Sequence, residues 1–443
     1  MNSTTVYRYD SLLIYGHWDE DLSLAWVEYN KTSPGTYTQE NVATPYPANW
    51  TNHTVTVDDA WKPGVHVIKL YANDTSGNLN DTLDWLSFDV WGRSAVYWIS
   101  PTGSVYRGEM KVTCQVKDYD TGEAIASYNV EFYNATDYLG SNTTNSSGYA
   151  IYTVDTSSYT PGVQTFYCKI VDDSTKYYDA VVTQASSDIT IRGKLNVSIL
   201  QPSDGVILER GISYEFKSIT KDEYDNIVTP DSANWYANGS LIGSQENITW
   251  SVPLSQERGL TEIKVNVTKN YYDASEDSVD VYVYGHAKPY WIEPDDGSYP
   301  AGKQVRLVCL IKDIDVNSGI QSYPVEFYYN STLIGRRLTN SSGHATILWD
   351  TTGLNATFKV SCQITHNETL YYNASLNENY TYITVYADTQ APNVTIVLPE
   401  NKTYTSSDVS LNYTVSDDYY LDQCWYSLDN GANQSLPSCQ NTT

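Results

Sequence analysis

The sequence predicts an all-β protein, built as a tandem array of antiparallel β-sandwich domains. Tyr, Thr, Ser and Asn are abundant, with 41 Tyr alone, and long helical runs of Ala, Leu, Glu and Lys are missing, which is typical of strands and turns. Residues 127–158 recur at residues 322–353 without a gap, and 15 of the 32 positions are identical. Each copy is too small to bury its apolar face alone, so the repeat indicates a duplicated sandwich.

Each copy of the repeat reads as a strand, a turn and a second strand. Tyr128, Val130 and Phe132 alternate with more polar residues, and the second copy keeps the same alternation. A period of two indicates a half-buried strand. The turn at residues 145–148 consists of Asn, Ser, Ser and Gly, which bend the backbone at low cost. The unit is therefore predicted to be antiparallel.

Composition and charge restrict the partners and the cellular setting. The 443 residues suffice for roughly three to five domains, and 53 acidic against 26 basic side chains give a net charge of −27. Such a charge repels nucleic acid and anionic membranes, so we expect neither a nucleic-acid partner nor membrane contact within this fragment. No run of 18 apolar residues occurs. The first residues lack a secretory signal, so we interpret the sequence as a fragment whose signal and anchor lie outside it.

Four alternating segments that end at a proline divide the chain. Proline lacks the N–H of a ladder and suits a strand end. The four prolines are Pro101, Pro202, Pro294 and Pro399. We predict five domains, at residues 1–92, 93–193, 194–285, 286–388 and 389–443. The first is expected to lack its opening strand and the fifth to stop near its middle.

The cysteines and tryptophans separate two kinds of domain. Long cysteine pairs lie in the second and fourth domains, on the inward face of alternating strands, where they can bridge two sheets. Because the pairs duplicate with the repeat and none is a C-x-x-C, disulfides are favoured over metal ligands, with free core thiols as the alternative. The pairs are Cys114 with Cys168, Cys309 with Cys362, and Cys424 with Cys439. The odd domains instead carry Trp26, Trp235 and Trp425, which we expect to be buried.

Several motifs resemble immunoglobulin-like (Ig-like) domains of bacterial and archaeal surface proteins. Residues 64–78, GVHVIKLYANDTSGN, look like the G-x-H-x-hydrophobic … A-x-D-x-S-G-N signature of such domains. The TNSSGxA unit resembles invasin-type repeats, and residues 388–395 with the CWYSLDNG motif are similar to archaeal surface-protein repeats. The resemblance implies Ig-like sandwiches of an S-layer-like or adhesin-type protein. The antibody pattern is broken, because Phe166 and Val360 stand where a corner tyrosine would be.

Sequons are the most frequent candidate modification sites. The chain contains 24 N-x-S/T sequons, each of which can accept a glycan in a secreted protein. The alternative is that a chain rich in Asn, Ser and Thr forms sequons by chance. The candidates are Asn73, Asn134, Asn145, Asn238, Asn340 and Asn412.

Metal and catalytic motifs are weak. Asp313, Asp315 and Asn317 have the spacing that opens a calcium loop, but the bidentate Glu expected at position twelve is replaced by Pro324. Ca²⁺ is thus the one candidate cofactor, and turn-forming aspartates are the alternative. The six histidines are scattered, and no hydrolase, P-loop or zinc-protease motif occurs. We expect no enzyme, and we expect His66 to face outward.

Tyrosine pairs recur along the chain. They stand at residues 177–178, 271–272, 328–329, 371–372 and 419–420. Such rings can stack on sugars or fill a partner's surface. The alternative is that they support the strands through cross-strand pairs.

The sequence as a whole predicts a non-enzymatic extracellular stalk of a cell-surface or S-layer-like protein, archaeal by its resemblance. One alternative is an adhesin that binds glycans or partner proteins. A second alternative is the accessory region of a large secreted enzyme. The expected partners are other cell-surface proteins or glycans, together with self-association.

Overall fold

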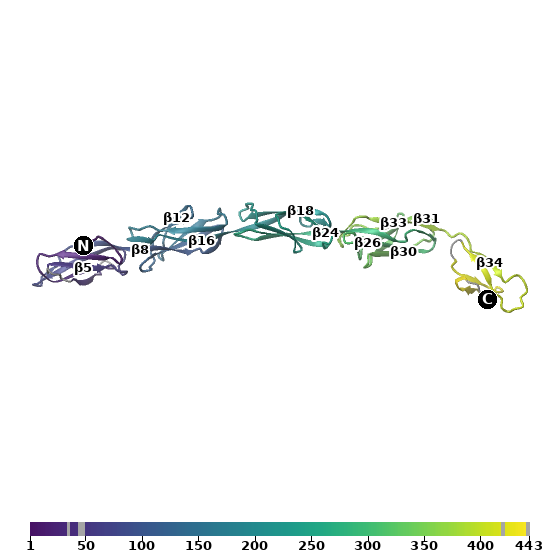
Figure 1. The fold of residues 1–443 in the computed structure, drawn as a ribbon, viewed down its shortest axis with the longest axis horizontal. Helices are drawn as coiled ribbons and strands as arrows, with labels where there is room; N and C mark the ends of the chain where they lie inside the picture. Colours follow the sequence, from purple (N-terminus) through teal and green to yellow (C-terminus); the bar gives the residue numbers. More distant parts are fainter. Residues whose placement is uncertain (33–35, 43–48, 418–420, 440–443) are drawn as a thin grey trace. The chain divides into compact units, whose positions relative to one another are not determined.

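The computed structural model describes residues 1–32, 36–42, 49–417 and 421–439, and strands dominate it throughout (Figure 1). Within these residues the regular structure comprises 37 strands and one 3-10 turn. No helix among them is long and apolar enough to cross a membrane. The prediction of an all-β tandem array of Ig-like sandwiches is confirmed. The division into five domains stays a prediction, and first to fifth domain denote its segments.

The first domain packs a two-stranded sheet against a larger one. β2 pairs with β5, and the second sheet runs β4-β3-β6-β8, with β1 parallel to β8. Between them lies an apolar core that includes Leu12, Val27 and Trp61, each completely buried. The strands are β1 (Thr5–Tyr7), β2 (Ser11–His17), β3 (Leu22–Tyr29), β4 (Thr38–Val42), β5 (Trp50–Thr56), β6 (Gly64–Asp74), β7 (Leu79–Asn80) and β8 (Leu86–Ser100).

The second domain contains the first copy of the repeat. One sheet runs β13-β10-β8 with β15 parallel to β8, and the other runs β12-β11-β14-β16 with β9 parallel to β16. Val130 and Phe132 point into the core, as the alternation predicts. The strands are β9 (Gly103–Tyr106), β10 (Glu109–Asp118), β11 (Asn129–Asn134), β12 (Tyr138–Thr143), β13 (Tyr149–Asp155), β14 (Gly162–Lys169), β15 (Tyr178–Val182) and β16 (Gln184–Gln201).

The fourth domain repeats this arrangement. One sheet contains β24, β26 and β30, and the other runs β25-β33-β31-β28-β29. Val325 and Phe327 take the core positions of Val130 and Phe132. The strands are β24 (Ser275–Glu293), β25 (Gly297–Pro300), β26 (Gln304–Asp313), β27 (Ser318–Gly319), β28 (Pro324–Tyr329), β29 (Thr332–Leu338), β30 (His344–Asp350), β31 (Ala356–Gln363), β32 (Tyr372–Ala374) and β33 (Glu378–Tyr386).

The third domain lacks a disulfide among its described residues and has an aromatic core instead. The Phe216 ring lies 5.6 Å from both Trp235 and Trp250, centroid to centroid. β18 pairs with β21, β19 with β20, and β17 runs parallel to β24. The strands are β17 (Ile207–Glu209), β18 (Ser213–Asp222), β19 (Ser232–Ala237), β20 (Ser240–Gly243), β21 (Asn247–Ser251), β22 (Gly259–Thr268) and β23 (Tyr272–Asp273).

The described residues of the fifth domain form two short hairpins. One pairs β34 (Asn393–Leu398) with β35 (Asn412–Ser416), and the other pairs β36 (Cys424–Tyr426) with β37 (Gln434–Leu436). The 3-10 turn η1 (Pro437–Cys439) follows, and Cys439 is bonded to Cys424 of β36.

Two of the three predicted buried tryptophans are not in a core. Trp235 is completely buried, but Trp425 is 58% exposed and Trp26 is only partly buried. In β3 the core face belongs to Ala25 and Val27, so Trp26 necessarily points the other way. The alternation of that strand therefore places Ala25 and Val27, and not Trp26, in the core.

The prediction that His66 faces outward is wrong. Its side chain is 4% exposed, and its two ring nitrogens lie 2.6 Å from the carbonyl oxygens of Asn30 and Lys62. Neighbouring Val65 is exposed instead. Hydrogen bonding to the two carbonyl groups compensates the imidazole for the loss of its water contacts on burial. The residue pattern of the strand does not reveal these two carbonyl partners.

Candidate functional site at the domain junctions

The two long disulfides form in the pairs that the sequence predicts. Cys114 of β10 is bonded to Cys168 of β14, and Cys309 of β26 is bonded to Cys362 of β31. In both domains the two strands belong to different sheets, and all four cysteines are completely buried. Each disulfide therefore ties the two sheets of one sandwich together inside its core.

The candidate glycosylation sites lie in two settings. Asn145 and Asn340 are exposed in the duplicated turns, where each Oδ1 accepts hydrogen bonds of 2.9–3.0 Å from the backbone N–H groups two and four residues further on. Asn238 is also exposed, in a turn with a φ of 45°. The partly buried candidates, on β6, β11 and β35, are Asn73, Asn134 and Asn412. Glycan attachment stays a prediction at all six.

The candidate calcium ligands have protein partners. Asp313 Oδ2 lies 3.1 Å from Arg210, and Asp315 Oδ1 lies 2.9 Å from His286 Nδ1. Asn317 Oδ1 accepts a hydrogen bond from the ammonium group of Lys312 at 3.2 Å. Asp313 Oδ1 also accepts the backbone N–H of Asp315 at 3.0 Å, which is the turn that the sequence offered as the alternative. The described residues contain no group of three or more carboxylate, His or Cys side chains that could hold a metal ion.

Three long strands run through the predicted domain boundaries. β8 pairs with β6 and β1 in its first half and with β10 and β15 in its second half. β16 pairs first with β14 and β9 and then with β23. β24 pairs first with β17 and then with β26 and β32. Each of these crossing strands belongs to two successive domains, so no free linker separates them.

Each crossing strand carries a glycine that is covered by a tyrosine ring. A Cβ on these glycines would lie only 2.8, 2.5 and 3.0 Å from a ring carbon, respectively, so the close approach requires glycine. Each glycine N–H also donates to the carbonyl group that immediately precedes the tyrosine, at 2.9–3.0 Å. These junction glycines and junction tyrosines are Gly92 with Tyr178, Gly193 with Tyr272, and Gly285 with Tyr372.

A buried ion pair closes the first junction. Arg8 Nη1 lies 2.5 Å from Asp118 Oδ2, and both side chains are 3% exposed. Arg8 Nε donates to the carbonyl oxygen of Trp61 in its own domain at 2.9 Å. From the second domain, the Tyr178 hydroxyl donates to the same Asp118 oxygen at 2.8 Å. Because both charges are hydrogen-bonded as well as paired, their burial is compensated.

The third junction repeats this arrangement with other residues. Arg210 Nη1 lies 3.1 Å from Asp313 Oδ2, and Arg210 Nε donates to the carbonyl oxygen of Gln256 at 2.6 Å. The Tyr372 hydroxyl donates to Asp313 Oδ2 at 2.7 Å. A second guanidinium, that of Arg258, lies 3.9 Å from the centre of the Tyr372 ring, a cation–π contact.

The second junction uses one arginine and two acids. The Arg107 Nη2 atom lies 3.0 Å from Asp222 Oδ2 and 2.7 Å from Glu223 Oε2. Burial alone would raise the pKa of Asp222, but hydrogen bonds from Arg107 and Asn226 outweigh burial and lower the pKa. Burial likewise opposes the hydrogen bonds of Glu223, whose pKa is also lowered. Both carboxyl groups are therefore held in the charged form that the arginine needs.

The sequence contained a signal for these junctions that motif reading missed. The junction arginines follow a short strand near the start of three domains, and an acid ends the first long strand that lies wholly within the following domain. The repeated tyrosine pairs are such a signal, because the second residue of three of these pairs packs on a junction glycine. The pair at residues 419–420 lies outside the described residues. The junction arginines are Arg8, Arg107 and Arg210.

An aromatic surface covers the outer face of the large sheet in the first domain. Trp26 stacks on Tyr71 with ring centres 5.4 Å apart, and Tyr37 stacks on Trp85 at 4.7 Å. Lys69 Nζ lies 5.0 and 6.0 Å from the ring centres of Tyr71 and Trp85. Tyr37 and Trp85 remain 45% and 37% exposed. This aromatic surface joins β3 and β6 to the segments before β4 and β8.

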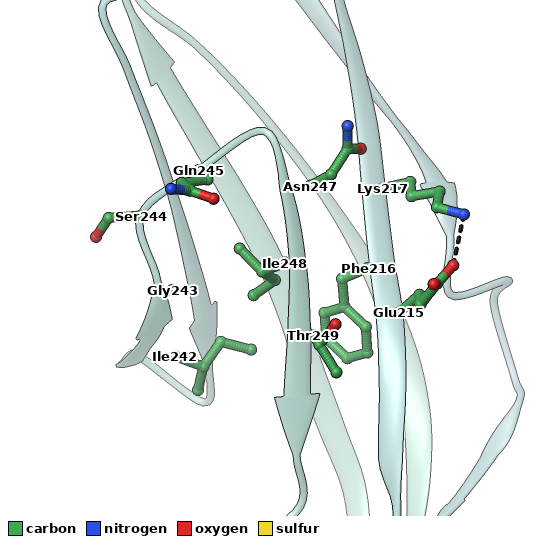
Figure 2. A pocket seen from close by; sticks show the side chains of 10 residues that line it. All are labelled: Glu215, Phe216, Lys217, Ile242, Gly243, Ser244, Gln245, Asn247, Ile248 and Thr249. Atoms are coloured by element: carbon green, nitrogen blue, oxygen red, sulfur yellow. Dashed lines mark ion pairs between the residues drawn. The ribbon is translucent and has the colours of Figure 1, made fainter.

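The third domain has a shallow open groove of about 570 Å³ beside β18, β20 and β21 (Figure 2). Figure 2 shows Glu215 and Lys217 at one side of it, joined as an ion pair. Ile248 lies over Gly243, where a Cβ would come within 2.7 Å of it.

No protein-family model matches the chain, and no curated protein matches it. Among solved structures, it is similar to a tetra-tandem repeat in the extending region of a large adhesion protein, with 12% identity, a TM-score of 0.44 and coverage of 85% of this chain and 96% of that chain. It is also similar to immunoglobulin domains 1–5 of Sidekick-1, with 12% identity, a TM-score of 0.31 and coverage of 87% and 80%. A three-Ig segment of titin matches with 10% identity, a TM-score of 0.36 and coverage of 67% and 99%. These three solved structures are arrays of consecutive domains.

Proposed function

We propose that this chain is the non-enzymatic stalk of an extracellular surface protein of the S-layer-like type, and that it presents other parts of that protein. The observation that carries the proposal is the series of three junctions, each with a strand running through it and a buried arginine–carboxylate contact. Domains joined in this way are restrained relative to each other, whereas domains on flexible linkers are not. Presentation at a distance requires that restraint.

Two further properties support an extracellular setting. Disulfides persist in oxidising compartments, and the chain has three of them and no free cysteine among its described residues. The net charge of −27 favours solubility and weakens adhesion to anionic surfaces. An archaeal source and glycosylation at the exposed sequons belong to this proposal.

The extracellular setting is tested by the intact mass of the protein from its native host, before and after reduction with alkylation. We expect alkyl groups to be gained only after reduction, together with a mass excess in multiples of hexose residues. Six alkylated thiols without reduction and no added mass would show a reducing, unmodified environment. That result would overturn the proposal.

The stalk function is tested by replacing residues 93–388 in the parent protein with a Gly/Ser linker of equal length. We expect normal export but reduced access of an antibody to the segment presented beyond the replacement, because a flexible chain spans a shorter mean distance. A replacement by three unrelated, directly joined Ig-like domains is the control and should restore access. Full access with the Gly/Ser linker would contradict a presenting role.

The aromatic surface of the first domain favours a second candidate function, an adhesin. Trp and Tyr rings supply large contact area at low entropic cost and often lie in recognition surfaces. Binding of the chain to a glycan array should fall at least tenfold in the Trp85→Ala and Tyr37→Ala variants. Tyr382→Ala, at an exposed tyrosine of the fourth domain, is the control. Array binding that all three variants leave unchanged, or no binding at all, would exclude this surface as a glycan site.

A further inference from the structure

The outer face of one sheet of the fourth domain carries opposite charges at its two ends. The sheet contains β24, β26 and β30, and the residues that alternate with the core positions of these strands form its outer face. We propose that this outer face is a self-association surface, through which two copies of the chain pack with a twofold axis between them. The proposal goes beyond the stalk function, because it names the surface that a second copy contacts and holds wherever the chain is located.

Two lysines stand directly opposite each other at the first end of the face. The register pairs Lys288 of β24 with Lys312 of β26. Their ammonium groups lie 5.3 and 5.7 Å from the centre of the Tyr290 ring, so both positive charges gather at one ring. Like charges directly opposite each other in a ladder destabilise a sheet. Carboxylates of a bound partner would relieve this repulsion.

The duplicated second domain shows that the fold does not require the lysine pair. In that domain the register pairs Ala95 of β8 with Lys117 of β10. The two pairs are equivalent, because Lys117 and Lys312 each directly precede the last residue of their strand. The lysine at position 288 therefore belongs to the surface of the fourth domain and not to the shared fold.

Apolar side chains occupy the middle of the face. Leu348 of β30 is 56% exposed, and Leu310 of β26 pairs with Tyr290 and is partly exposed. In the second domain the polar Gln115 stands at the position of Leu310. An apolar centre with charged groups around it is the usual composition of a protein–protein interface.

Carboxylates dominate the second end of the face. Glu293 ends β24, Asp350 ends β30, and both are exposed. Asp295 and Asp296, which are also exposed, follow in the loop after β24. Arg306 of β26 pairs with Glu293, its Nη1 atom lying 2.7 Å from Oε2. These five side chains together carry a negative charge.

The two charged ends lie almost a full strand apart. Asp350 pairs with Gln304, the first residue of β26, whereas Lys312 is the last residue but one of the same strand. A twofold axis that runs across the strands, between two facing copies, places the lysine end of each copy against the acidic end of the other. The opposite orientation would place like charges together, which selects against it.

The size of the face predicts a weak contact. Three strands at a spacing of about 4.8 Å and a rise of about 3.3 Å per residue cover about 400 Å² on each copy. A stable complex buries about twice that area per partner. The association should therefore depend strongly on the charged ends and be sensitive to salt.

The first test measures self-association of the full chain by sedimentation equilibrium at about 50 mM and about 500 mM salt. We expect a monomer–dimer equilibrium whose dissociation constant rises about tenfold or more at the higher salt concentration. Lys312→Ala should raise the dissociation constant about tenfold at low salt. The matched control is Lys117→Ala, at the equivalent position of the second domain, which should leave the dissociation constant unchanged.

A charge swap then identifies the surface. One variant carries Lys288→Glu with Lys312→Glu, and the other carries Glu293→Lys with Asp350→Lys. Neither variant should dimerise alone, because the charges at the two ends of its face no longer complement each other. An equal mixture of the two variants should dimerise again, since unlike ends then meet at both contacts.

Three results would overturn the proposal. The parent chain could stay monomeric at both salt concentrations, or both swapped variants could still dimerise alone. Alternatively, the monomeric parent could bind polygalacturonate and Lys288→Glu could abolish that binding, which would assign the face to an acidic polysaccharide. Loss of the extracellular assignment would leave all of these outcomes unchanged, so the two proposals fail independently.

Discussion

At the scale of single residues, two buried tyrosines show what the repeat conserves. Tyr128 and Tyr323 directly precede β11 and β28, the two copies of the duplicated strand, and are each 1% exposed. Their hydroxyls donate to the carbonyl oxygens of Val171 and Thr365 at 2.7 and 2.6 Å. Burial raises the pKa of both phenols to about 12, and for Tyr128 nearby aspartates add to the rise. The fold therefore holds both phenols in the neutral form.

These tyrosines predict an alkaline limit of stability. A phenol whose pKa is about 12 when folded and about 10 when unfolded stabilises the fold fully below pH 10 and loses that contribution as the pH rises toward 12. The raised pKa of each phenol should lower the free energy of unfolding of its domain by about 1 kcal/mol between pH 10 and pH 11. Thermal unfolding at a series of pH values measures this loss.

The matched variants for this prediction are Tyr323→Phe and Tyr380→Phe. The first should reduce the alkaline loss in the fourth domain and cost about 1 kcal/mol at pH 8, because it removes a buried hydrogen bond. The second, at a tyrosine that is 49% exposed, should change neither quantity. An alkaline loss in Tyr323→Phe as large as that of the parent chain would contradict the assignment.

A second prediction at the residue scale concerns Gly148 in the duplicated turn. Its φ is +79°, and a Cβ there would lie 2.6 Å from the carbonyl oxygen of Val116. Gly148→Ala combines a left-handed conformation with a backbone clash, so it should destabilise the second domain by about 3 kcal/mol. Gly122→Ala is the control, since its φ is +76° but nothing lies within 4 Å of its Cβ; it should cost about 1 kcal/mol. If Gly148→Ala and Gly122→Ala lower the free energy of unfolding equally in denaturant titrations, the surrounding backbone accommodates the added Cβ.

At the scale of elements, the disulfides join strands that no ladder connects. Cys114 and Cys168 are 54 residues apart, Cys309 and Cys362 are 53 apart, and both bonds cross between the sheets. The third bond, near the end of the described chain, closes only 15 residues. Loop entropy makes the two long bonds the stronger restraints on unfolding.

We predict that removing one long disulfide affects one domain. The double variant Cys114→Ala with Cys168→Ala should lower the free energy of unfolding of the second domain by about 4 kcal/mol in the loop-entropy model. In calorimetry of the full chain, one transition should move while that of the fourth domain stays in place. The counterpart Cys309→Ala with Cys362→Ala should move the other transition. If both variants shifted the same transition, the domains would not unfold independently.

At the scale of the whole molecule, the second junction predicts a response to acid. The lowered pKa values of Asp222 and Glu223 mean that their contacts with Arg107 stabilise docking above the ordinary carboxyl pKa, about pH 4, and that this contribution is lost as the pH falls further. Spin labels that flank the second junction should show a broader distance distribution at pH 3 than at pH 6. Far-ultraviolet circular dichroism should be unchanged, because the sheets themselves stay folded.

The control for the acid response is Arg107→Ala. The distance distribution of this variant should be broad at both pH values, since Asp222 and Glu223 no longer have their arginine partner. Arg306→Ala, which removes an exposed ion pair with Glu293 in the fourth domain, should behave as the parent. If the distance distribution of the parent chain stays narrow at pH 3, the continuity of β16 alone holds the second junction.

Much of the fold could be predicted from the sequence because its signals are local. The alternation of Val130 with polar neighbours, the turn at residues 145–148 and the spacing of the cysteines each arise within a few residues or a single duplicated unit. A period of two and a chain-bending turn leave few alternatives to antiparallel sheets. The same local patterns determined which faces of the duplicated strands are buried.

Only the tertiary structure decided what depends on residues far apart. Arg8 and Asp118 are 110 residues apart in the chain, and Tyr178 joins them from a third segment, so no periodicity connects them. The inward position of His66 and the outward position of Trp26 likewise depend on strand phase and on carbonyl groups supplied by other elements. The sequence by itself determined a tandem series of β-sandwiches. The packing of distant charges and rings decided how those sandwiches are joined, because burial and pairing are properties of the folded chain and not of any stretch of it.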